Sequence, residues 1–159
     1  MLLAGIIGAS LMLGASAFEI KNTYAEGQFT DVPSSEWYAS EVKSTYELGL
    51  MNGVGGGLFA PNGNVTVAEA ITMASRAASI YAGETIESAD GEWYQMYVNY
   101  AIAKGFVKEG QFADYNANAT RFEVAEIFAK AMPEGYFSAK NNANECAEVV
   151  ITLEALLID

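Results

Sequence analysis

Apolar residues recur at helical spacing in five stretches of this chain, and polar or glycine-rich segments separate the stretches. Spacings of three and four residues between apolar positions are typical of amphipathic helices. The expected helices lie at 36–48, 67–81, 93–104, 121–132 and 147–157. The segment 51–57 between the first two contains four glycines and cannot hold a helix. The pattern predicts an all-α fold.

Landmarks of the first two helices recur in the next two at a nearly constant interval. Trp37 and Trp93 are 56 residues apart, and Thr66 and Thr120 are 54 apart. A fixed period of this length indicates stacked units, none of which can bury its apolar face alone. The expected segments are a signal peptide at 1–17, a leader at 18–28, a first repeat at 29–82, a second at 83–135 and a partial third at 136–159.

The second helix of each full repeat has a well-marked start. Thr66 stands three residues before Glu69, as Thr120 does before Glu123. In such a capping box, the hydroxyl accepts from the third amide and the carboxylate returns to the amide of the threonine. For the first helix, we expect Ser34 or Ser35 to be the cap.

The amino-terminal run from Leu2 to Ala17 is apolar, rich in small residues, and ends in an A-x-A pattern. This composition is typical of a secretory signal peptide, although no Lys or Arg precedes the run. A transmembrane anchor is the alternative, but the run is short for one. We interpret the chain as exported.

The composition argues against two classes of function, nucleic-acid binding and histidine-based catalysis. The formal net charge is −12, which argues against a nucleic-acid partner because phosphates would be repelled. The chain has no His, so a histidine triad or a histidine zinc site cannot form, and an enzyme is the weakest function class. We expect no cofactor and no metal. Cys146 has no partner for a disulfide and is interpreted as a small core residue, with a reactive thiol as the alternative.

Two other motifs partly match known binding loops. Asp114, Asn116 and Asn118 have the alternate spacing of a calcium loop, but the sixth position is Ala119 and the twelfth is Ala125. An Asx-rich turn is the favoured interpretation. The glycine-rich segment 51–57 is not a phosphate loop, since no Lys-Ser/Thr follows it.

The order of these motifs resembles the S-layer homology domain over 29–78 and again over 93–132. The residues that carry the resemblance are Phe29, Asp31, Pro33, Trp37, Gly49, Phe59, Pro61 and Thr66–Glu69, then Trp93, Gly105, Phe112 and Thr120–Glu123. The resemblance implies tandem helix–loop–helix units about a pseudo-threefold axis, usually three in a row. It also implies an exported module of the bacterial cell surface that binds secondary cell-wall polysaccharide, often through an acidic pyruvylated sugar, or peptidoglycan.

In this family, the Arg of a Thr-Arg-Ala-Glu tetrapeptide contacts the sugar carboxylate in a groove between neighbouring units. Here Arg121 holds that position in the second repeat, and Val67 holds it in the first. A guanidinium in the first turn of a helix suits bidentate carboxylate binding. A surface ion pair is the alternative for Arg121. A groove built on Thr66 would lack its cation, and we expect it to bind poorly.

The other candidate glycan-binding residues have structural alternatives. Thr120 is interpreted first as a helix cap. Trp37 and Trp93 could stack on a sugar ring, but packing in the core is favoured because each begins an apolar stripe. Asp31 is either a groove residue or a turn residue.

A second function class stays open. The partial third repeat would leave an apolar face without its second helix, which favours self-association or a protein partner. A missing carboxy-terminal effector domain is a further alternative.

Overall fold

The computed structural model describes residues 20–133 of the chain. Within that range it contains four helices: α1 (Ala39–Glu47), α2 (Val67–Ala82), α3 (Gln95–Lys104) and α4 (Arg121–Ala131). The same residues form no strand, only two isolated bridges, so the predicted all-α class is confirmed. The signal peptide, Cys146 and the third repeat lie outside the described residues. Packing about a pseudo-threefold axis stays a prediction.

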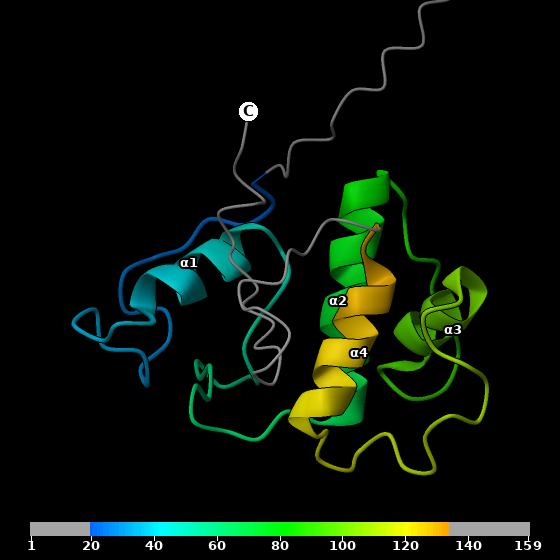
Figure 1. The fold of residues 1–159 in the computed structure, drawn as a ribbon. Coiled ribbons are helices and arrows are strands. Elements are labelled where there is room, and N and C mark those ends of the chain that lie inside the picture. The colour runs from blue at the N-terminus through cyan, green and yellow to red at the C-terminus, as the bar shows by residue number, and fades with distance from the viewer. Residues whose placement is uncertain (1–19, 134–159) are drawn as a thin grey trace, which may run out of the picture.

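The longest helix, α2, is the centre of the fold. It packs against both α3 and α4, and Figure 1 shows α4 lying beside it. Its inward positions are small or β-branched, and Ile71 and Ala74 are fully buried. Small side chains let neighbouring helices approach closely, which is why one helix can serve two partners. Tyr81, near the end of the helix, is exposed.

The first repeat has an aromatic cluster of its own around α1. Phe29, Val32 and Val42 are buried there, and the Phe29 ring lies edge-on to Tyr46 and Phe59, with centroids 5.6 and 5.3 Å apart. Edge-to-face pairs of this kind add to the energy of burial. The cluster joins the segment before α1 to the loop after it.

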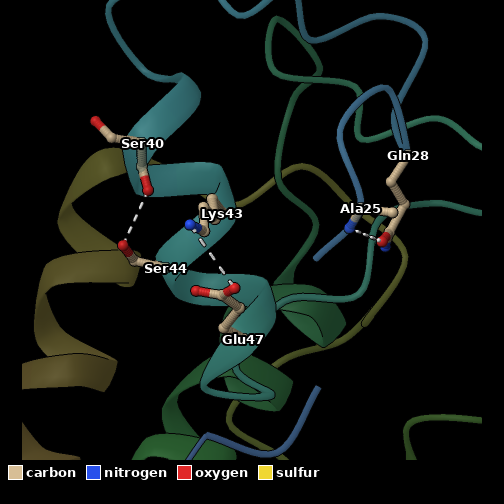
Figure 2. A network of polar contacts seen from close by, with 6 residues as sticks. All are labelled: Ala25, Gln28, Ser40, Lys43, Ser44 and Glu47. Carbon is tan, nitrogen blue, oxygen red and sulfur yellow. Dashed lines mark hydrogen bonds and ion pairs between the residues drawn. The ribbon is translucent and has the colours of Figure 1, made fainter. Parts of the chain in front are cut away.

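The outer side of α1 is held by local polar contacts (Figure 2). The Ser44 hydroxyl donates to the Ser40 carbonyl at 2.9 Å, and Lys43 Nζ lies 4.0 Å from Glu47 Oε1. These groups are one turn apart on the helix, as interacting surface pairs are. Lys43 is therefore a cation with a carboxylate partner.

Helix ends were predicted well for α2 and α4 and poorly for α1. Both capping boxes are confirmed, with Thr66 and Thr120 as N-caps. Gly105 ends α3 in the left-handed conformation, as expected. The expected serine cap of the first helix is wrong: α1 begins later, its N-cap is Tyr38, and no side chain caps it.

A short backbone seam joins the two repeats. Thr66 and Asn118 form an antiparallel bridge, and the Ala119 amide donates to the Val65 carbonyl at 2.8 Å. The amides of Val67 and Ala68, at the start of α2, donate to carbonyls of the segment 115–117. Amides in the first turn of a helix have no partner within it, so the second repeat satisfies the start of α2.

Candidate functional site

A cavity of about 560 Å³ lies beside α2. Three parts of the chain line it: the loop that joins α1 to α2, one side of α2, and Trp93 from the second repeat. The lining residues are Leu50–Val54, Phe59–Pro61, Gly63–Val65, Glu69, Thr72, Met73, Arg76 and Trp93. Small-molecule sites in proteins commonly measure about 300–1,000 Å³, so the cavity could hold a ligand of that class.

Arg76 is the cation in the wall of this cavity. Its Nε and Nη2 donate to the Tyr97 hydroxyl at 3.2 and 2.9 Å, and its Nη1 donates to the Leu50 carbonyl at 3.2 Å. The guanidinium carbon also lies 5.0 Å from the centre of the Tyr97 ring. A long side chain held at three points loses little further entropy when it binds a ligand.

Two more polar side chains of α2 line the cavity. Glu69 is committed to the capping box, where its Oε2 accepts from the amide and hydroxyl of Thr66 at 2.8 and 3.0 Å. Thr72 is 5% exposed, and its buried hydroxyl oxygen has no hydrogen-bond partner within the described part of the chain. A buried hydroxyl without a hydrogen-bond partner is rare in a folded protein and calls for an explanation.

Both tryptophans are exposed, so the favoured core interpretation is wrong. Trp37 is 83% exposed and Trp93 is 54% exposed. Each precedes its helix, and the following tyrosine turns inward; the Trp93 ring lies edge-on to that of buried Tyr94, with centroids 5.4 Å apart. The apolar stripe therefore starts one residue later than the sequence suggested. Trp93 lines the cavity and Trp37 does not.

Arg121 is exposed at the first position of α4. Among residues 20–133, it makes no hydrogen bond or ion pair, so the surface ion pair weighed as an alternative is not formed there. The Thr120 hydroxyl before it accepts from the Glu123 amide at 3.2 Å and donates to the Glu123 carboxylate at 2.8 Å. This network lowers the pKa of Glu123, mainly through its bond from the Thr120 amide. Thr120 is thus occupied as a cap.

Asp31 is held by the backbone of its own repeat. Its two carboxylate oxygens accept from the amides of Phe59 and Ala60 at 2.9 and 2.7 Å. The bond from Phe59 is the main cause that lowers the pKa of Asp31. Both carboxylate oxygens of Asp31 therefore have backbone partners, as expected of a turn residue, and no ligand is needed to explain its position.

The cavity contains a cation that the sequence interpretation missed. Val67, the counterpart of Arg121, is buried in the core, but Arg76 supplies a positive charge about two and a half turns further along α2. A signal was present: Arg76 follows Thr66 by ten residues, and Lys130 follows Thr120 by the same ten. Comparing the repeats beyond the tetrapeptide would have found it.

The predicted Asx turn is confirmed, since the Asn116 amide donates to Asp114 Oδ1 at 2.8 Å. Within residues 20–133, no group of three or more His, Cys, Asp or Glu side chains could hold a metal ion. Within the same range, no helix has the length and apolar character needed to cross a membrane.

Comparison with known proteins agrees with the motif order. A family model of the S-layer homology domain matches residues 28–71. The chain is 32% identical over 120 residues to a surface-layer 125 kDa protein of Lysinibacillus sphaericus, covering 68% of this chain and 10% of that protein. It is 30% identical over 88 residues to a cellulosome-anchoring protein of Acetivibrio thermocellus, covering 50% of this chain and 20% of that protein.

Enzymes are also among the similar proteins. An amylopullulanase of Thermoanaerobacterium thermosulfurigenes is 32% identical over 121 residues, which cover 68% of this chain and 6% of the enzyme. The matched part of the chain spans 6–12% of the length of three curated relatives. The shared part is the S-layer homology domain, a non-catalytic anchoring domain. The chain therefore belongs to the S-layer homology domain proteins of the bacterial cell surface.

Proposed function

We propose that the chain anchors its parent protein non-covalently to an acidic glycan of the cell wall, and that it has no catalytic activity of its own. Secondary cell-wall polysaccharide that carries pyruvylated or other acidic sugars is the first candidate ligand, and peptidoglycan is the second. The anchoring role follows from the family. The choice of an acidic glycan rests on the side chains around the cavity.

The observation that carries the proposal is that Arg76 and Trp93 line the same cavity. An exposed indole offers a flat apolar face to a sugar ring, while its N–H can bond a hydroxyl. An arginine offers a planar fork that matches a carboxylate. The two residues come from different repeats, so the site is completed only when the repeats pack together.

Arg121 is the proposed contact of a second groove, as expected for the tetrapeptide. It is exposed and lies where the dipole and unpaired amides of α4 favour an anion. The unit expected after α4, at 136–159, lies outside the described residues. Thr120, Trp37 and Asp31 are weaker candidates. The capping box already uses the Thr120 hydroxyl, backbone amides already bind the Asp31 carboxylate, and Trp37 does not line the cavity.

Retention of the purified protein on cell-wall sacculi tests this function. We expect retention to fall by at least tenfold in Arg121→Ala. Lys108→Ala is the matched control, because Lys108 is also exposed and lies outside the cavity. No retention of the wild-type protein would overturn the function. Unchanged retention of Arg121→Ala would remove Arg121 from the site while leaving the function standing.

Self-association is the second candidate function. One observation favours a protein contact near α4: Phe122, beside Arg121, is 75% exposed. Large exposed aromatic side chains mark contact surfaces when they gather in patches. Light scattering after size exclusion decides this, since a monomer at all concentrations would exclude self-association, and a dimer that Phe122→Ser abolishes would support it.

A further inference from the structure

We propose that Arg76 determines the preference of the cavity for an anionic group, and that Tyr97 is the positioning residue that holds its guanidinium in place. The inference rests on the proposed glycan-anchoring function and goes beyond the tetrapeptide arginine. It assigns the selective contact to a residue near the middle of α2, in the repeat whose tetrapeptide has no cation.

Arg76 keeps donors available for a ligand. A guanidinium has five N–H groups, and the contacts with Tyr97 and Leu50 use one on each of its three nitrogens. One N–H therefore remains on each terminal nitrogen. Two N–H groups are what a carboxylate needs for a bidentate pair.

The positive charge of Arg76 is not balanced by a carboxylate. Its partners, the Tyr97 hydroxyl and the Leu50 carbonyl, are both neutral. Elsewhere in the described part of the chain, Lys43, Lys104 and Lys130 each pair with a glutamate, and the cations without a carboxylate partner, Lys21, Lys108 and Arg121, are exposed to solvent. In a chain of net charge −12, a partly buried cation held only by neutral groups is unusual. A bound anion would supply the missing charge.

Thr72 strengthens the case from the same side of the helix. It precedes Arg76 by four residues, and residues four apart lie on one face. Its hydroxyl oxygen lacks a partner, and the residue is more than nine-tenths buried in the cavity wall. A ligand held at Arg76 would therefore lie over the same side of α2 as Thr72.

The other features of the cavity leave Arg76 as the point where an anion can bind. The first amides of α2 do not serve, because Val67 and Ala68 donate to the second repeat and Glu69 donates to Thr66. Glu69 is seven residues before Arg76, about 10 Å along the helix. A ligand carboxylate would be repelled there and attracted to the opposite end.

The test compares two preparations of sacculi, one native and one whose carboxyl groups have been converted to amides with carbodiimide and ammonia. Binding isotherms are measured on both for the wild-type protein and for Arg76→Gln, Arg76→Lys, Tyr97→Phe and the control Lys108→Gln. Circular dichroism checks that each variant is folded. The readout is the ratio of the two affinities, which a purely structural role would leave unchanged.

We expect the wild-type protein and Lys108→Gln to bind native sacculi at least tenfold more tightly than amidated sacculi. Arg76→Gln should lower this ratio severalfold, and the preference that remains should come from Arg121. Arg76→Lys should keep an intermediate ratio, because the charge stays and the fork is lost. Tyr97→Phe should also lower the ratio, because Arg76 keeps its charge but loses the hydroxyl that positions its guanidinium.

Four results overturn the proposal in distinguishable ways. If the wild-type protein binds neither preparation, both the proposed glycan function and the role of Arg76 are wrong. Equal wild-type binding to both preparations leaves the function and removes the anion preference. If Arg76→Gln is folded and keeps the wild-type ratio, glycan binding and the anion preference both stand, but Arg76 has no role in the preference. If Arg76→Gln is unfolded, wild-type ratios in both Arg76→Lys and Tyr97→Phe overturn the proposal.

Discussion

The Asp31 carboxylate accepts a hydrogen bond of 2.7 Å from the backbone amide of Ala60, 29 residues later in the chain. Ala60 has a φ of 59°, a left-handed conformation that costs energy for any residue other than glycine. The bond from the Ala60 amide to Asp31 stabilises this turn and holds the loop against the segment before α1. The loop in turn forms one wall of the cavity.

The first prediction concerns Asp31 and pH. Since folding lowers the pKa of Asp31 below its ordinary value of 3.8, its contribution to stability is present above that value. The contribution is lost as the pH falls through the lower, folded pKa. We expect Asp31→Asn to lower the melting temperature at neutral pH, and the difference from wild type to shrink in acid. A difference that stays constant with pH would contradict this.

Gly53 provides a steric prediction with a matched control. Its φ is +77°, and an added Cβ would lie 2.5 Å from the Leu58 carbonyl oxygen and 2.7 Å from the Phe29 ring. Gly56 has a similar φ of +61° with nothing within 4 Å. Gly56→Ala should cost about 1 kcal/mol for the strained backbone alone. Gly53→Ala should cost about 1–3 kcal/mol more, because neighbouring atoms must move. Equal urea midpoints for the two variants would refute the clash.

The capping boxes predict the cost of removing a hydroxyl. Thr66→Ala should destabilise the protein by about 1 kcal/mol, and Thr66→Ser should restore most of the loss. The effect of Thr120→Ala should be smaller, since Thr120 is exposed whereas α2 supports both α3 and α4. Urea unfolding of the four proteins measures this. The same loss in Thr66→Ser as in Thr66→Ala would show that the cap is not the cause.

The two tryptophans allow the cavity to be observed directly. The chain has two Trp residues, so Trp37→Phe leaves Trp93 as the one indole, and Trp93→Phe leaves Trp37. Because Trp93 lines the cavity, wall polysaccharide should shift the fluorescence of the protein that retains Trp93. The protein that retains Trp37 should not respond. A response from Trp37 alone would place the ligand elsewhere.

Tyr100 predicts a loss of stability in alkali. Burial, followed by the hydrogen bond to Glu84, raises the pKa of Tyr100 from 10.0 to about 12. Between these values the folded state keeps a proton that the unfolded state has released, so stability falls as the pH rises. Tyr100→Phe should make this decline shallower, as measured by urea midpoints across the interval. An identical decline in the variant would contradict the assignment.

Much of the fold could be predicted because its signals are local. A capping box needs only Thr66 and Glu69, three residues apart, and both boxes form as expected. A left-handed glycine ends α3 through its own backbone preference. The exposed tryptophans could not be predicted in this way, because at a helix start the period alone does not decide whether Trp93 or Tyr94 turns inward.

The site depended on contacts between distant residues. Arg76 meets Tyr97, 21 residues away, and Leu50, 26 residues away, and only then does it become a fixed cation in a cavity wall. Asp31 meets Ala60 across a similar distance. The sequence by itself determined where α2, α3 and α4 end, the repeat and the family, since these follow from neighbouring residues and motif order. Only the tertiary structure decided which cation faces the cavity, because helix packing brings together side chains that no local spacing relates.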